Sequence, residues 1–193
     1  MIKTIKFLII FLFMILILSC SSKNDYINET KTSSPEEMYK KGMELANNKN
    51  LDSAKIEFKK ITDSYPLSNE GIQSEIMIAF IEYSKLNYFD AILKFNKIIN
   101  TYPSYKDIEY VYYMRALCYY EQIKNSKLDG SYNIKALNNF ELIINRFPNS
   151  KYSKDSQQKI IFIKENIAAK HMNIAFFYFN QQVTRCLYIL NAY

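Results

Sequence analysis

Apolar and polar positions follow a pattern that recurs three times along this chain. The stretches AKIEFKKITDSYP, AILKFNKIINTYP and ALNNFELIINRFP each carry Ala, an aromatic residue four positions later, Ile three further on, and Tyr or Phe four after that. These offsets put the four side chains on one face of a helix, and the Pro that follows ends that helix. The five positions are Ala54, Phe58, Ile61, Tyr65 and Pro66; Ala91, Phe95, Ile98, Tyr102 and Pro103; and Ala136, Phe140, Ile143, Phe147 and Pro148.

Another apolar helix is predicted before each copy, at residues 38–46, 76–84 and 111–120. The three prolines are 37 and 45 residues apart, which indicates an insertion around residues 123–132. Two helices per unit, with a period of roughly 34 residues and a proline-ended second helix, resemble the tetratricopeptide repeat. The small residues Gly42, Ala79 and Ala116 stand where such repeats pack closely. We therefore expect an all-α solenoid of about three TPR-like helix-turn-helix repeats plus a further long helix; an ordinary helical bundle is the alternative.

The folded domain is expected to span residues 35–182. Its start is predicted at Ser34-Pro35-Glu36-Glu37, where Ser caps a helix, Pro takes the first turn and Glu37 completes a capping box. In tetratricopeptide proteins the first helix of each pair lines a concave groove. Aligned on the repeat, an aromatic and apolar set of candidate peptide-binding residues lies on that side: Tyr39, Met43, Ile76, Phe80, Tyr83, Tyr113, Leu117 and Tyr120. For each of them, burial between helices is the alternative.

The N-terminus has the order of a bacterial lipoprotein signal. Lys3 and Lys6 precede an apolar run at residues 7–18, which is too short for an ordinary membrane span. Ile17-Leu18-Ser19-Cys20 resembles a lipobox, which implies a signal peptide at residues 1–19 and a covalent lipid on Cys20. An uncleaved anchor and an ordinary signal are the alternatives. Residues 20–34 are expected to be the lipidated Cys and a flexible tether, and Ser at position 21 favours the outer membrane.

Composition argues against several functional classes. The formal net charge of +6 is mild and no run of Lys or Arg stands out, so we expect no nucleic-acid partner. His171 is the single His and no phosphate-binding Gly loop is present, so we expect no enzyme, no metal site and no cofactor. Cys118 is predicted to be a buried thiol, while a Cys118–Cys186 disulfide remains open.

Two stretches carry a more specific resemblance. IEYVYYMRALCYYEQI at residues 108–123 and RFPNSKYSKDSQQKIIFIKENIAAKHMNIAFFYF at residues 146–179 resemble the outer membrane assembly factor family BamD, also called ComL. The resemblance implies a periplasm-facing, lipid-anchored outer membrane component of the β-barrel assembly machinery (the BAM complex). It implies as partners the barrel-forming subunit of the Omp85 type, other lipoproteins of the complex and unfolded outer membrane proteins. The groove would bind an extended C-terminal signal of those substrates.

Residues 183–193, VTRCLYILNAY, fit neither the repeat nor the resemblance, and we interpret them as an atypical tail. A frameshift, a truncated C-terminus and a naturally short form all explain such a tail. Other functional classes also stay open: a scaffold lipoprotein for pilus assembly, competence or envelope division, a peptidoglycan-associated competence factor, and a lipoprotein that delivers an enzyme subunit.

Overall fold

The computed structural model describes residues 34–123 and 130–191, the last six of these as backbone only. Residues Pro35–Tyr193 form one compact unit. The predicted signal peptide, Cys20, the tether and most of the insertion around residues 123–132 lie outside the described residues.

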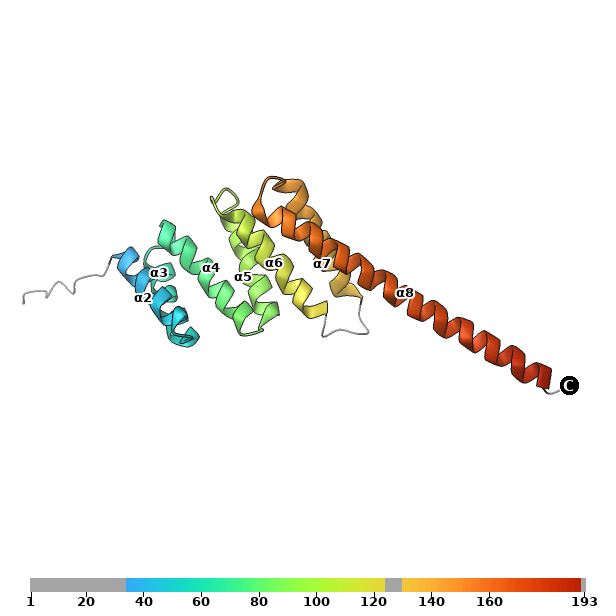
Figure 1. Ribbon diagram of the computed structural model, residues 1–193. Coiled ribbons are helices and arrows are strands. Elements are labelled where there is room, and N and C mark those ends of the chain that lie inside the picture. Colours follow the sequence, from blue (N-terminus) through green and yellow to red (C-terminus); the bar gives the residue numbers. More distant parts are fainter. Residues whose placement is uncertain (1–33, 124–129, 192–193) are drawn as a thin grey trace, which may run out of the picture. The chain divides into compact units, whose positions relative to one another are not determined.

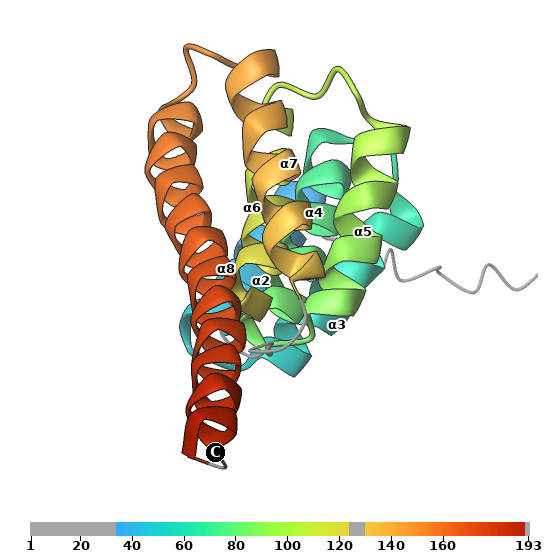
Figure 2. The ribbon, with the colours of Figure 1, turned by 90° about the vertical axis from the view of Figure 1, so that its right-hand side faces the viewer.

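The described part is all-α, as predicted, and contains no strand. Each helix packs against the next one in the chain, and Figures 1 and 2 show the helices side by side in sequence order. The first helices of successive pairs also contact one another, so α2 meets α4, α4 meets α6, and α6 meets α8. The helices are α2 (Pro35–Asn47), α3 (Leu51–Ser64), α4 (Asn69–Ser84), α5 (Tyr88–Thr101), α6 (Ile108–Ile123), α7 (Ser131–Arg146) and α8 (Lys151–Asn191).

The repeated face predicted from the sequence is the core of the molecule. Nine side chains, three from each copy, are between 0% and 1% exposed: Ala54, Phe58, Ile61, Ala91, Phe95, Ile98, Ala136, Phe140 and Ile143. The three copies also end alike. In each, the backbone N–H of the aromatic residue donates to the carbonyl oxygen of the Ile four residues earlier, at 2.7 Å for Tyr65, 2.8 Å for Tyr102 and 2.8 Å for Phe147. The aromatic residue and the exposed Pro after it therefore terminate each second helix in one geometry.

The predicted small residues lie inside the helix pairs. Gly42 is buried in α2, and a Cβ built on it would lie 2.7 Å from Cε1 of the fully buried Phe58 ring. Ala79 and Ala116 follow at intervals of 37 residues and are both 0% exposed. Each first helix thus presents a small side chain toward its own unit's core, which lets the two helices of a pair approach closely.

One helix begins earlier than the sequence indicated. The apolar pattern placed the start of a helix at Ile76, whereas α4 begins at Asn69. Ser68 caps it, accepting a hydrogen bond from the Gly71 N–H at 2.9 Å. The first two turns contain one large apolar residue, Ile72, so apolar periodicity does not reveal them.

The turns inside the first two helix pairs share one backbone conformation. Lys49 and Leu86, which lie 37 residues apart, have φ of 60° and 63°, in the left-handed region that favours glycine. In both turns the N–H after this residue reaches back to the helix: Asn50 donates to Leu45 O and Asn87 donates to Glu82 O, each at 2.9 Å. These bonds are those of a Schellman motif. Its left-handed position is usually Gly, but here it is occupied by Lys49 and Leu86.

We expect Leu86→Gly to raise the free energy of unfolding by about 0.5–1 kcal/mol, because Gly relieves the left-handed strain. Leu86 is 69% exposed, so little burial is lost. The matched control is Leu93→Gly inside α5, where Leu93 is 52% exposed. That change is expected to lower the free energy of unfolding by about 1 kcal/mol. Urea denaturation of both variants measures the difference, and an equal loss in both would contradict the interpretation.

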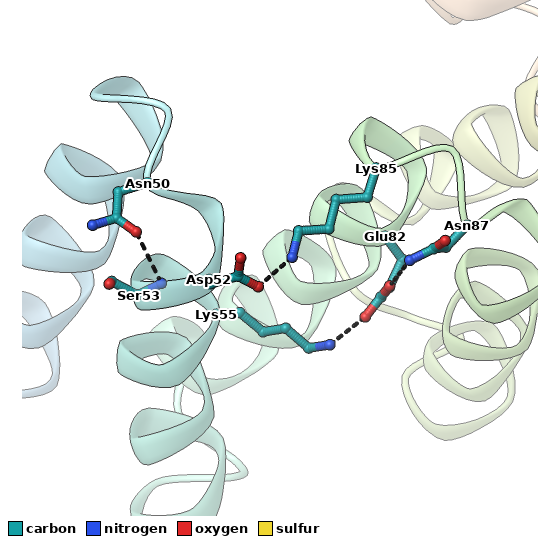
Figure 3. A network of polar contacts seen from close by, with 7 residues as sticks. All are labelled: Asn50, Asp52, Ser53, Lys55, Glu82, Lys85 and Asn87. Atoms are coloured by element: carbon teal, nitrogen blue, oxygen red, sulfur yellow. Dashed lines mark hydrogen bonds and ion pairs between the residues drawn. The ribbon is translucent and has the colours of Figure 1, made fainter.

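A buried carboxylate ties the first helix pair to the second (Figure 3). Glu82 in α4 is 4% exposed and accepts hydrogen bonds from Lys55 Nζ in α3 and, at 3.0 Å, from Asn87 Nδ2. Lys85, which directly follows α4, forms a second ion pair with the exposed Asp52 of α3. Burial alone would raise the pKa of Glu82, but the bonds from Lys55 and Asn87 outweigh it and hold the pKa below its ordinary value of 4.5.

We expect Glu82→Gln to lower the free energy of unfolding at pH 7 by about 1–3 kcal/mol, because a charge-assisted pair is lost. The pKa of Glu82 is lower in the folded state than in the unfolded state. The stability that its ionised carboxylate contributes is therefore fully present above the unfolded-state pKa, and it is lost as pH falls through the folded-state pKa. The difference between wild type and variant should therefore shrink below about pH 4.5. Denaturation from pH 7 down to pH 3 tests this, and a constant difference would contradict it. Glu141→Gln, which removes an exposed ion pair with Lys164, is the control with little expected effect.

Candidate functional site

The eight predicted groove residues form rows on the first helices of the pairs, at the repeat interval of 37 residues. Tyr39, Ile76 and Tyr113 make one row, Met43, Phe80 and Leu117 the next, and Tyr83 and Tyr120 a third. Ile76 is buried, at 6% exposure, and the other seven are half-buried. These side chains therefore contribute both to the packing between helices and to the surface of the first helices.

A recess of about 290 Å³ lies on this side of the helices. It draws side chains from α2, α4, α6, α8 and the segment between α5 and α6: Tyr39, Gln73, Ile76, Met77, Tyr105, Asp107, Tyr110 and Tyr152. Two of the predicted residues, Tyr39 and Ile76, line it directly. The other six lie elsewhere on the same helices.

Aromatic packing holds the recess walls. The Tyr39 ring lies 5.5 Å from the core ring of Phe58, and the Tyr110 ring lies 5.8 Å from Tyr152 in α8. The Tyr105 hydroxyl donates to Asn69 Oδ1 at 3.3 Å and so bridges to the start of α4. Each wall therefore comes from a different unit of the repeat, and contacts between units determine its position.

Tyr113 sits directly behind the recess. Its ring stacks on Tyr152 at 4.8 Å, and its hydroxyl donates to Asp155 Oδ2 at 2.5 Å. Burial, followed by the bond to Asp155, raises the pKa of Tyr113. The residue thus positions Tyr152, and with it the α8 wall of the recess, rather than facing the recess itself.

The remaining candidates pack away from the recess. The ring of Tyr83 lies 6.3 Å from Phe80 and 5.7 Å from Tyr88 in α5. The Tyr120 ring lies 6.0 Å from Phe140 and 5.9 Å from Phe162 in α8. Two further candidates pack against buried clusters: Met43 against the one around Phe58, and Leu117 against the larger one.

The chemistry of the recess is that of neutral tyrosines. Burial, and after it the neighbouring Tyr152, raises the pKa of Tyr110 to about 12, so its hydroxyl keeps its proton at physiological pH. Burial likewise raises the pKa of Tyr39 and Tyr105. The walls offer apolar ring surface, hydroxyl donors, the Gln73 amide and one carboxylate, Asp107. This combination suits binding of a peptide segment with large apolar side chains.

The sequence also contained a signal that the prediction did not use. Gln73 and Tyr110 stand three residues before Ile76 and Tyr113, and so lie one turn earlier on the same helical face. Extending each predicted row by one turn would have found them. Tyr105 and Tyr152 come from outside the predicted first helices, and their placement depends on how successive units pack.

Other residues with possible chemistry have structural roles. Cys118 is fully buried as a free thiol, as predicted, and burial raises its pKa to about 12. The Cys186 side chain lies outside the described residues. Within the described ranges, no group of three or more His, Cys, Asp or Glu could hold a metal ion.

A second hollow, lined mainly by α3, α4 and α5, contains four lysines, Lys55, Lys59, Lys94 and Lys97. Three of them already pair with carboxylates: Lys55 with Glu82, Lys59 with Asp63, and Lys97 with Glu75. An anion would have to compete with these pairs. The tyrosine-lined recess is therefore the stronger candidate site.

Comparison with known proteins agrees with the resemblance seen in the sequence. A family model described as outer membrane lipoprotein, YfiO, matches residues 31–193, and so extends through the segment interpreted as a tail. An outer membrane protein assembly factor BamD from Rickettsia prowazekii is 34% identical over 166 residues, which cover 84% of this chain and 64% of the relative. The BamD of Caulobacter vibrioides is 28% identical over 74% of this chain and 47% of its own length. The BamD of Buchnera aphidicola is 28% identical over 89% of this chain and 74% of its own length.

The chain thus spans less than two thirds of the length of the first two of these relatives. In the described residues, no helix is long and apolar enough to span a membrane. Because the family match extends over most of the sequence and several relatives share one name, the chain belongs to the outer membrane lipoprotein family YfiO, as the resemblance to the BamD family predicted.

Proposed function

We propose that this protein is a non-enzymatic lipoprotein component of the outer membrane β-barrel assembly machinery. It helps outer membrane proteins to insert and assemble, and its recess binds an extended segment of those substrates. The observation that carries the proposal is the tyrosine-lined recess on the first helices, in a chain of the outer membrane lipoprotein family whose relatives are named assembly factors.

The proposal includes the anchor and the partners. A lipid on Cys20 attaches the chain to the outer membrane, and the helical domain faces the periplasm. The partners are the barrel-forming subunit of the Omp85 type, other lipoproteins of the complex and unfolded outer membrane proteins; no nucleic acid and no cofactor takes part. Several acyl chains on one residue support stable anchoring, since a single chain binds membranes only marginally.

The recess suits an unfolded substrate for a physical reason. An extended peptide presents alternate side chains to one side, and a hollow lined by ring faces takes up one large apolar side chain at low conformational-entropy cost. The Tyr110 hydroxyl and the Gln73 amide lie at its walls, where they can donate to peptide carbonyls. Affinity would then come from the rings and orientation from the polar groups.

Titration of a fluorescent peptide into the purified full chain tests the recess. The peptide has the sequence of the last strand of an outer membrane β-barrel protein, and a scrambled version is the peptide control. We expect Tyr110→Ala to weaken binding about tenfold, which corresponds to about 1.4 kcal/mol, because one wall is lost. Phe89→Ala, which removes a 72% exposed ring on α5, should leave binding unchanged. Equal binding of both peptides, or equal effects of both variants, would count against the proposed recess.

A pull-down from detergent-solubilised outer membranes tests the partners separately. Recovery of the Omp85-type barrel subunit supports the assembly role. Recovery of a secretin or of peptidoglycan-linked proteins instead would favour the alternative, a scaffold lipoprotein for pilus assembly, competence or envelope division.

A further inference from the structure

The recess has an acidic side that its tyrosines do not explain. Asp107, which directly precedes α6 and is exposed, lines it, and the described lining residues include no Lys or Arg. In the described part of the chain, no ion pair engages the Asp107 carboxylate. An acidic group at the wall of a ligand site, with no basic partner of its own, is free to pair with a cation on the ligand.

A second carboxylate lies on the same side. Glu70, in the first turn of α4, is half-buried and likewise has no basic partner among the described ion pairs. Burial is the largest cause of the raised pKa of Tyr105; Asp107 and Glu70 raise it further, and a hydrogen bond from Gln73 opposes them. The Tyr105 hydroxyl is therefore within electrostatic reach of both carboxylates, and the potential there is negative.

The rings of the recess favour the same sign of charge on a ligand. A tyrosine ring attracts a cation to its face, because the face carries the negative part of the ring quadrupole. The structure contains one such contact in this region: Lys151 Nζ lies 5.0 Å from the centroid of the Tyr152 ring. Lys151 itself lines a separate hollow, beside Phe147 and Pro148. Ring faces and carboxylates therefore both favour a cationic group on a peptide in the recess.

We propose that Asp107, supported by Glu70, makes the recess select peptide segments that carry a Lys or Arg two residues from the large apolar side chain. In an extended peptide, residues two apart point to the same side and lie about 6.5–7 Å apart. The apolar side chain then enters between the rings, while the basic side chain lays its apolar stem along them and pairs with Asp107. This inference rests on the proposed function, since it requires a peptide in the recess.

A capping role for Asp107 needs to be separated from this one. Asp is common directly before a helix, where its carboxylate bonds to free N–H groups and offsets the helix dipole. The Asp107 backbone oxygen accepts from the Tyr110 N–H at 3.0 Å, but no hydrogen bond of the described residues uses the carboxylate. Asn caps helices as well as Asp does, so Asp107→Asn removes the charge and keeps the capping ability.

Titration of the purified full chain with three matched fluorescent peptides tests the preference. The first has one Phe and, two positions on, a Lys; norleucine or Glu replaces that Lys in the other two. We expect the wild type to bind the Lys peptide about three- to fivefold more tightly than the norleucine peptide, and the Glu peptide least tightly. The Lys preference should shrink as NaCl is raised from about 50 mM to about 500 mM, while binding of the norleucine peptide stays constant.

The variants assign the preference to a residue. Asp107→Asn should weaken binding of the Lys peptide about threefold and leave the norleucine peptide unchanged, and Glu70→Gln should have a smaller effect in the same direction. The matched control is Asp90→Asn, which removes an exposed carboxylate from the first turn of α5, a helix that contributes no described residue to the recess. This control should bind all three peptides as the wild type does.

The outcomes separate this inference from the proposed function. Equal binding of the Lys and norleucine peptides by the wild type overturns the inference alone, because the apolar side chain still binds. A Lys preference that survives Asp107→Asn, or an equal loss for all three peptides, also overturns it, the latter by showing that Asp107 has a structural role. No binding of any peptide overturns the inference together with the proposed recess.

Discussion

The packing of one buried aromatic ring against a small residue on the neighbouring helix sets the dimensions of every helix pair. Phe58 is 0% exposed, and Gly42 approaches it so closely that even a methyl group would overlap the ring. Ala79 and Ala116 occupy the equivalent places in the next two pairs, in which Phe95 and Phe140 are equally buried. Because interiors are close-packed, the size of this one side chain fixes how near the two helices lie.

The recess depends on how successive pairs align. The first helices of successive pairs contact one another, and tyrosines from several units meet at the recess. Two hydroxyls hold the alignment: Tyr102 donates to Pro66 O at 3.2 Å and Tyr105 to Asn69 Oδ1 at 3.3 Å, each reaching back 36 residues. The buried Glu82 fixes the first pair against the second in a similar way. A peptide site built from several units therefore depends on contacts far from it in sequence.

The sequence predicted the core better than the site, and the reason is physical. Ala54, Phe58 and Ile61 interact within one helical face, so their spacing alone shows that they are buried. Whether Tyr39 faces the recess while Tyr83 packs against Tyr88 depends on the angle between units, which periodicity does not contain. Tyr152 joins the recess from the next unit along the chain. The start of α4 was missed because its first two turns contain one large apolar side chain, that of Ile72.

The central claim, that the small residue opposite each buried ring determines the packing of the pair, is tested most directly by the unfolding free energy of Gly42→Ala. In a helix this substitution alone stabilises by up to about 1 kcal/mol, whereas overpacking against a ring that cannot move costs about 1–3 kcal/mol. We predict a net loss of about 1 kcal/mol, while Gly130→Ala, whose nearest neighbour is the flexible end of Lys170, should change little. A Gly42→Ala variant that is more stable than the wild type would contradict the account.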